Sequence, residues 1–235
     1  DGGDASGDTA SGDCATADSS IWVLLPDTES SDRWETQDKP LFEQAFADAG
    51  IDATVVNAEG DAQQQQSQAE QAIAEGAGVI VLTELDSGSG ATILDLADEA
   101  GIGTVSHDRE NTESDGADAD VSFDNAQVGA LMAEVLEPAI DALELDHPAN
   151  IVELNAGPTD DNARLFAQAG VIMEQILTDV NNEVDAVFAA NDGLAGAAIT
   201  AMQAAGLDTQ TIPISGQDAT VPGIQLILSG DQTMT

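Results

Sequence analysis

The chain has 235 residues, with four Lys and Arg against 45 Asp and Glu, and a formal net charge of −41. Nucleic-acid binding requires Lys and Arg to release phosphate counterions, so this balance excludes nucleic acid and disfavours an anionic membrane surface as partners. A hydrophobic content of 42%, spread in regular segments, excludes a disordered acidic protein as well. Proteins adapted to high salt tolerate such charge, and we interpret the acidity in that way.

Residues 1–20 consist of Gly, Ser, Asp, Ala and Thr with a single cysteine, Cys14. This composition predicts a flexible, self-repelling linker that tethers a folded body to an anchor. A lone cysteine forms no intrachain disulfide, and its polar neighbours lack an apolar lipobox, so we expect a free thiol. The stretch DGGDASGD lacks the twelve-residue order and final Glu of a calcium loop. The sequence contains no apolar run of about 18 residues, which is the length that would predict a transmembrane helix.

From Ile21 onward, short apolar runs alternate with longer amphipathic segments. The apolar runs predict strands over residues 21–26, 52–58, 78–84, 103–108, 119–125, 150–157, 185–193 and 211–216. The intervening segments predict helices over residues 40–50, 63–76, 91–101, 126–144, 163–178 and 193–206. This alternation predicts an α/β fold with a doubly wound parallel sheet, and fully apolar strands fit a sheet that is buried on both faces.

Polar residues follow nearly every predicted strand, and ligands of open α/β sheets bind at the carboxyl ends of strands. They are Asp27, Arg33 and Trp34 at the end of the following loop, Asn57, Glu84, Asp86, His107, Asp108, Arg109, Asp124, Asn125, Asp160, Asp161, Asn162, Asn191, Asp192, Gln217 and Asp218. Asp and Asn also cap helices, which explains any single one of these positions without a ligand.

Arg109 and Trp34 are harder to explain by capping, because both residue types are scarce in this chain. Sugar hydroxyls donate and accept hydrogen bonds, so carboxylates, amides and guanidinium groups suit them together. The apolar face of a pyranose packs on an indole ring. The set therefore predicts a carbohydrate site in which Arg109 is a donor fork oriented by Asp108 and Glu110. The alternative for Arg109 is a structural salt bridge.

Several motifs together resemble the type I periplasmic sugar-binding proteins of ABC importers, most closely those that bind D-xylose. They are RWETQDKPLFEQAF, HDR, VSFDNAQVG, AGPTDDNARLF, DAVFAANDGLAGAAI, ISGQDATVPGI and QTMT, and the resemblance extends from Ile21 to Thr235. It implies two doubly wound lobes joined by a hinge that close over a monosaccharide. It also implies that the protein needs no cofactor or metal and is not an enzyme. The resemblance further implies an extracytoplasmic monomer that delivers the sugar to a permease.

The resemblance also assigns roles to particular residues. Trp34 corresponds to a stacking platform, Arg109 to a strand-end ligand, and Asp27 to a further candidate ligand. Asn162, Asn191 and Asp218 correspond to hydroxyl partners from the second lobe. Asp108 and Asp192 correspond to residues that support these ligands from behind.

The implied domains are a first lobe over residues 21–124 and a second over 125–230, with 231–235 starting a crossover back to the first lobe. A segment that the family carries, including a strand and a second aromatic wall, is missing between Gln168 and Ala169.

Other classes of function fit the sequence less well. The same fold also serves as a sensory domain that presents sugar to a chemoreceptor or sensor kinase. A DNA-binding repressor would carry a basic helix-turn-helix where residues 1–20 are acidic. For an enzyme, G-x-S-x-G, H-E-x-x-H and Walker A patterns are all missing, and carboxylate pairs carry little information in so acidic a chain. His107 and His147 are isolated in the sequence and predict no metal site.

Overall fold

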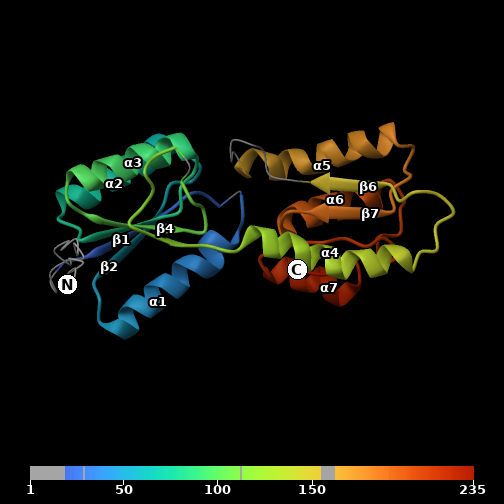
Figure 1. Cartoon of the computed structure of the whole chain (residues 1–235), viewed down its shortest axis with the longest axis horizontal. Helices are drawn as coiled ribbons and strands as arrows, with labels where there is room; N and C mark the ends of the chain where they lie inside the picture. The colour runs from blue at the N-terminus through green and yellow to red at the C-terminus, as the bar shows by residue number, and fades with distance from the viewer. Residues whose placement is uncertain (1–18, 29, 112, 155–161) are drawn as a thin grey trace, which may run out of the picture.

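The computed structural model describes residues 19–28, 30–111, 113–154 and 162–235, without the side chains of residues 162–169 and 171. The predicted linker over residues 1–20, with Cys14, lies almost wholly outside the described residues. Within the described ranges, no helix combines the length and apolarity that a membrane crossing requires. The described elements form two α/β lobes that lie end to end (Figure 1).

The first lobe is built on one parallel sheet with the strand order β2-β1-β3-β4-β5. Its elements are β1 (Ile21–Leu25), the π-helical turn η1 (Trp34–Asp38), α1 (Lys39–Ala49), β2 (Ala53–Asn57), α2 (Ala62–Ala74), β3 (Val79–Leu82), α3 (Ser87–Glu99), β4 (Gly103–His107) and β5 (Ala119–Val121). Strand β2 lies on one side of β1 in the sheet and β3 lies on the other, so the chain crosses back over β1 between β2 and β3. This reversal opens a crevice at the carboxyl ends of the strands.

Alternation along β1 explains why the sheet is buried on both faces. Trp22 and Leu24 pack in a core with α2 and α3, whereas Val23 and Leu25 pack in a second core with Phe42 and other residues. Figure 1 shows α1 on one face of the sheet and α2 and α3 on the other. The predicted doubly wound parallel sheet is therefore confirmed in this lobe.

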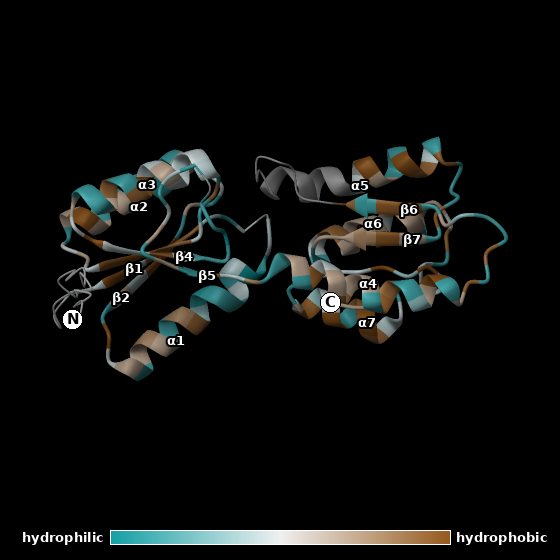
Figure 2. Cartoon of the chain, viewed as in Figure 1, coloured by the Kyte–Doolittle hydropathy of each residue, from teal (hydrophilic) through white to brown (hydrophobic). Residues whose placement is uncertain are grey.

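The second lobe follows directly on β5. Its elements are α4 (Asn125–Asp141), β6 (Ile151–Leu154), α5 (Asn162–Asp179), β7 (Ala186–Ala189), α6 (Asp192–Ala204), the short 3₁₀ turn η2 (Thr209–Thr211) and α7 (Val221–Ser229). Strands β6 and β7 are parallel, and their core includes Leu154, Met173, Val187 and Ile199. Figure 2 shows hydrophobic residues along the strands of both lobes.

The largest differences from the sequence prediction concern three elements. The strand predicted over residues 211–216 is reduced to a single bridge from Ile214 to Val187, because a 3₁₀ turn occupies its start and Pro213 has no N–H to donate. Helix α3 begins at Ser87 because Asp86 accepts a hydrogen bond from the Ser89 N–H at 2.8 Å. Helix α7 was not predicted, although the proline in its first turn is compatible with a helix start.

The first strands of the two lobes have unequal surroundings. Strand β1 pairs with β2 on one side and β3 on the other, whereas the pairing described for β6 is with β7 alone. Beside this lobe's sheet, α4 buries Met132 and Leu136 but leaves Leu131 49% and Val135 42% exposed. Strand β6 is also the more exposed of the two first strands, since it buries only Val152 and Leu154, whereas β1 buries Trp22 to Leu25.

We predict that the backbone amides of β6 exchange with solvent at least about tenfold faster than those of β1 in the folded protein. An edge strand with exposed residues at alternate positions opens by local fluctuation at a lower free energy than a buried strand paired on both sides. Hydrogen–deuterium exchange followed by mass spectrometry measures both strands in one sample, with β2, the edge strand of the first sheet, as the control. Equal protection of β1 and β6 would contradict the difference.

Candidate functional site

A cavity of about 520 Å³ opens between the two lobes. Its walls come from the β1–η1 segment, the segments that follow β4, β5 and β7, and the segment before α7. The lining residues are Ser30, Ser31, Arg33, Trp34, Asp108, Arg109, Glu110, Ser122, Phe123, Asn125, Ala190, Asn191, Gln217 and Asp218. The cavity therefore lies at the carboxyl ends of strands from both lobes, where the fold class places a ligand.

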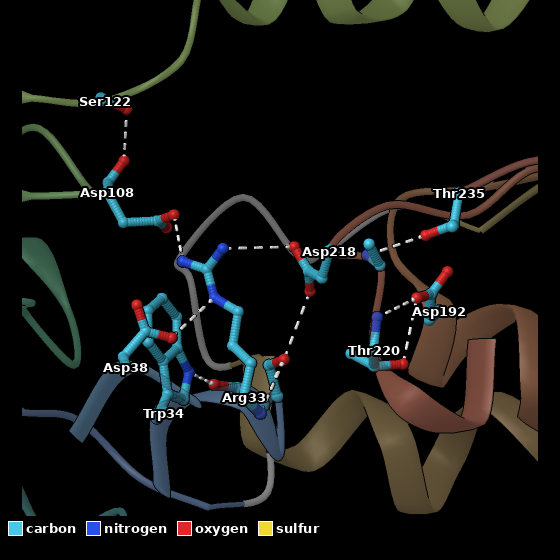
Figure 3. A network of polar contacts seen from close by, with 12 residues as sticks. Arg33, Trp34, Asp38, Asp108, Ser122, Asp192, Asp218, Thr220 and Thr235 are labelled. Carbon is cyan, nitrogen blue, oxygen red and sulfur yellow. Dashed lines mark hydrogen bonds and ion pairs between the residues drawn. The ribbon is translucent and has the colours of Figure 1, made fainter. Parts of the chain in front are cut away.

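Arg33 is the centre of the polar network in this cavity (Figure 3). Its Nη2 donates to Asp108 Oδ2, its Nη1 lies 3.4 Å from Asp218 Oδ1, and its Nε lies 3.4 Å from Asp38 Oδ2. Three carboxylates thus surround one guanidinium. The sequence places Arg33 in the loop after the first predicted strand but assigns it no role, although the scarcity that identified Arg109 applies to it equally.

Trp34 lies beneath Arg33 and lines the cavity. Its side chain is buried, and its Nε1 donates to Ser30 Oγ at 3.0 Å. The guanidinium carbon of Arg33 lies 4.0 Å from the centroid of the indole, and that of Arg109 lies 5.6 Å away. Both distances are in the range of a cation–π contact. Trp34 therefore positions two guanidinium groups as well as forming part of the wall.

Arg109 lies just beyond the end of β4, as the sequence predicted. Its Nη1 donates to the carbonyl oxygen of Glu84 at 2.7 Å, and its Nη2 donates to Ser30 Oγ at 3.2 Å. Asp108, immediately before it, adopts a left-handed backbone conformation with a φ of 68° and donates its N–H to Val121 at 2.7 Å. This turn places the side chains of both residues on the cavity wall.

The second lobe contributes Asn191 and Asp218. Asn191 caps α6 by accepting the N–H of Leu194 at 2.9 Å, and it also lines the cavity, so capping and a place in the site coexist. Asp218 Oδ2 accepts from Ser31 Oγ at 3.2 Å. Burial raises the pKa of the Asp218 carboxyl, and the Arg33 guanidinium offsets part of that rise.

Asp192 is buried behind the cavity rather than in its wall. Its Oδ2 accepts from the backbone N–H and the hydroxyl of Thr220 at 2.9 and 3.0 Å, and its Oδ1 accepts from Gln232 at 2.8 Å. A Cβ added at Gly216 would lie 2.3 Å from Oδ1, and one at Gly223 would lie 2.1 Å from Oδ2. Asp192 therefore ties the start of α6 to the segments on either side of α7.

The predicted ligand Asp27 does not line the cavity. Asp27 is almost fully buried, and its Oδ1 accepts the backbone N–H of Ser30, so it shapes the loop that carries Ser30. The side chain of Asn162 lies outside the described residues.

His107 lies behind the cavity wall. Its ring makes edge contacts with Trp34 and Phe42, and its Nδ1 lies 2.9 Å from Thr83 Oγ1. Among the residues described, no three His, Cys, Asp or Glu side chains are grouped to hold a metal ion.

The fold and cavity define a class: an α/β binding protein of two lobes with a polar site between them. The periplasmic binding protein domain family matches residues 22–171 and 166–235, and the chain belongs to that family. Its fold is the type I periplasmic binding protein fold, as the resemblance implied.

Two named relatives illustrate the range of the family. The D-xylose-binding periplasmic protein of Escherichia coli (strain K12) is 32% identical over 234 residues, which span 87% of this chain and 68% of that protein. The multiple sugar-binding periplasmic receptor ChvE of Rhizobium radiobacter is 26% identical and matches 92% of this chain and 72% of its own.

Solved structures share the fold at lower identity. An ABC transporter solute binding protein from Clostridium phytofermentans with bound β-D-glucose superposes with a TM-score of 0.77 and 24% identity, over 90% of this chain and 76% of that one. A Caulobacter myo-inositol binding protein superposes with a TM-score of 0.71 and 22% identity, over 90% and 79% of the two chains.

We predict that the stability of the first lobe falls as the pH drops below about 6.5, the ordinary pKa of His107. Burial lowers the pKa of His107, while Asp38 and Asp108 raise it and Arg33 lowers it. Above that pH the imidazole is neutral in both states, and below it the unfolded chain binds the proton more readily than the folded one. Acid therefore favours unfolding.

Tryptophan fluorescence during urea unfolding measures this effect, because both tryptophans, Trp22 and Trp34, lie in the first lobe. His107→Gln should flatten the dependence between pH 7.5 and 5.5. His147→Gln is the control, since that exposed histidine has a raised pKa and contributes with the opposite sign. A slope unchanged by His107→Gln would contradict the assignment.

Proposed function

We propose that this protein is an extracytoplasmic solute-binding protein that captures a monosaccharide in the interlobe cavity and delivers it to an ABC importer. The observation that carries the proposal is the composition of that cavity. Two guanidinium groups, three carboxylates, two asparagines of the second lobe and one indole converge on a volume of about 520 Å³. Such a volume suits a small polar ligand.

The chemistry of the wall favours a neutral polyhydroxylated ligand. Arg33 and Arg109 offer donors, and Asp108, Glu110 and Asp218 offer acceptors, so hydroxyl groups at different positions of a sugar ring find partners. Charge-assisted hydrogen bonds of this kind are about twice as strong as neutral ones. The wrong sugar would leave some of these charged groups unpaired, which is the basis of discrimination.

D-xylose is the sugar that we propose. The support is the 32% identity to the D-xylose-binding protein of Escherichia coli, together with the 31% identity to the corresponding protein of Haemophilus influenzae. Relatives named for several sugars, or for ribose, lie at lower identity.

We also propose that the protein acts as a monomer and is tethered outside the membrane through residues 1–20.

We predict that D-xylose binds in calorimetric titrations in molar salt, with glucose, ribose and arabinose binding more weakly. Arg109→Ala should lower the affinity by about tenfold to a hundredfold, because a hydrogen bond to a charged group contributes about 1.5–3 kcal/mol. Trp34→Ala should also weaken binding strongly, since it removes part of the wall and the support of two guanidinium groups.

Lys39→Met is the matched control for the loss of a cation. Lys39 pairs with Glu35 on the first turn of α1, outside the cavity. The sugar affinity of the Lys39→Met variant should equal that of the parent protein. Folded Trp34→Ala and Arg109→Ala variants that bind sugar normally would show that the site lies elsewhere, and a folded parent that binds no sugar would count against the proposal itself.

We propose that the protein is adapted to high salt. A net charge of −41 on 235 residues produces strong self-repulsion. The Debye length shortens from about 10 Å at 0.1 M salt to about 3 Å at 1 M, which removes most repulsion between exposed carboxylates.

The Tm should therefore rise by at least about 5 °C between these salt concentrations, which corresponds to roughly 2 kcal/mol for a chain of this size. Differential scanning calorimetry in potassium chloride measures the change. Sucrose at equal osmolality is the control, because it stabilises through exclusion from the surface without screening charge. A Tm that rises equally in sucrose, or not at all in salt, would contradict the adaptation.

We propose further that the second lobe lacks one strand–helix unit near residues 168/169. In the first lobe, α1, β2 and α2 lie between β1 and β3, whereas α5 alone lies between β6 and β7. Two features support this proposal: the family matches the chain in two stretches that overlap over residues 166–171, and the described pairing of β6 is on one side only.

A further inference from the structure

We propose that the ion pair between Arg33 and Asp218 is a clasp that holds the two lobes together through protein groups alone and so controls how readily the cavity opens. The inference concerns regulation of the proposed sugar site, and it rests on the proposed function only for its biological use.

The contacts of Asp218 cross from one lobe to the other. Its Oδ1 lies 3.4 Å from Nη1 of Arg33, and its Oδ2 accepts from Ser31 Oγ at 3.2 Å. The side chains of Arg33 and Asp218 are only 11% and 10% exposed. Salt screens a pair as buried as this far less than it screens surface charges, so the attraction persists in molar salt.

Arg33 is held in place before it meets the second lobe. Asp38 and Asp108 bind its guanidinium from the first lobe, and the indole of Trp34 supports it at 4.0 Å (Figure 3). A side chain that is already ordered loses little rotamer freedom when it forms one more contact, and this entropy loss is what usually weakens ion pairs. The arrangement therefore makes the cross-lobe contact more favourable than a contact between two mobile side chains.

The remaining charges between the lobes make Arg33 decisive. Asp108 and Asp192 are the other charged groups that act on Asp218, and both raise its pKa, as two like charges do. Without the guanidinium, the carboxylates of Asp38 and Asp108 in the first lobe would face those of Asp192 and Asp218 in the second. The Arg33 guanidinium, which pairs with carboxylates of both lobes, therefore replaces part of this repulsion with attraction.

A ligand that enters the cavity meets this clasp directly, because Arg33 and Asp218 both line the wall. The population of open molecules sets how fast a ligand enters, and the population of closed molecules sets the apparent affinity. A clasp between protein groups shifts both populations in the absence of ligand.

Pulsed electron paramagnetic resonance between two spin labels tests the clasp. Labels at Glu43→Cys on α1 and Glu174→Cys on α5, in a Cys14→Ser background, report the distance between the lobes. In the sugar-free protein, Asp218→Asn should lower the ratio of the closed to the open population about tenfold and lengthen the mean distance. Ser31→Ala keeps the ion pair but removes the second contact, together with the hydrogen bond that Ser31 Oγ accepts from the Arg33 N–H at 3.4 Å, and it should shift the distribution in the same direction by less.

Asp231→Asn is the matched control. It also neutralises one aspartate of the second lobe, but the contacts of Asp231 with Thr209 and Ser229 stay within that lobe. Its distance distribution should equal that of the parent. If folded Asp218→Asn and Ser31→Ala both give the parent distribution, the clasp does not exist.

Titration of the unlabelled parent with sugars separates the two proposals. Sugar binding together with unchanged distances in Asp218→Asn overturns the clasp and leaves the proposed function standing. Longer distances in Asp218→Asn, with no sugar bound by the parent, support the clasp and overturn the function.

Discussion

The arrangement of the cavity depends on one buried guanidinium shared by three carboxylates. In a chain with four Lys and Arg, Arg33 joins Asp38, Asp108 and Asp218, which come from η1, the end of β4 and the segment before α7. Each carboxylate would be costly to bury alone, because an ionised group without a partner loses its hydration without compensation. The cation therefore makes it possible for three acidic segments to converge on one point.

The first lobe was predictable because its signals are local. Apolar strands such as β1 are recognised from five residues, and the helices after them are marked by capping aspartates and closing glycines. The position of Arg109 followed from the end of a strand. Arg33 was located in the loop after β1 but was given no role, because its role arises from carboxylates 5, 75 and 185 residues away along the chain, and sequence spacing carries no record of such contacts. Asp192 was placed behind the ligands without its actual partners, Thr220 and Gln232, for the same reason.

The second lobe departs further from its sequence prediction. The strand predicted over residues 211–216 has the composition of a strand, but strand formation depends on a neighbour, and only Ile214 bridges to β7. Helix α7 begins with a valine, a proline and a glycine, which suggest a loop when they are considered singly. The two lobes thus show that a repeated strand–helix pattern predicts a fold class more safely than it predicts how many strands a sheet contains.

The contacts of Asp192 restrict how this site can change during evolution. Gly216 and Gly223 lie against its two carboxylate oxygens, with no room at either position for even a methyl group. A side chain at either glycine would displace the carboxylate and, with it, the start of α6, where the neighbouring Asn191 caps the helix and lines the cavity. New ligand preferences in a descendant of this protein are therefore closed off at these two glycines, and the segment that joins Asp192 to both sides of α7 is inherited as a unit.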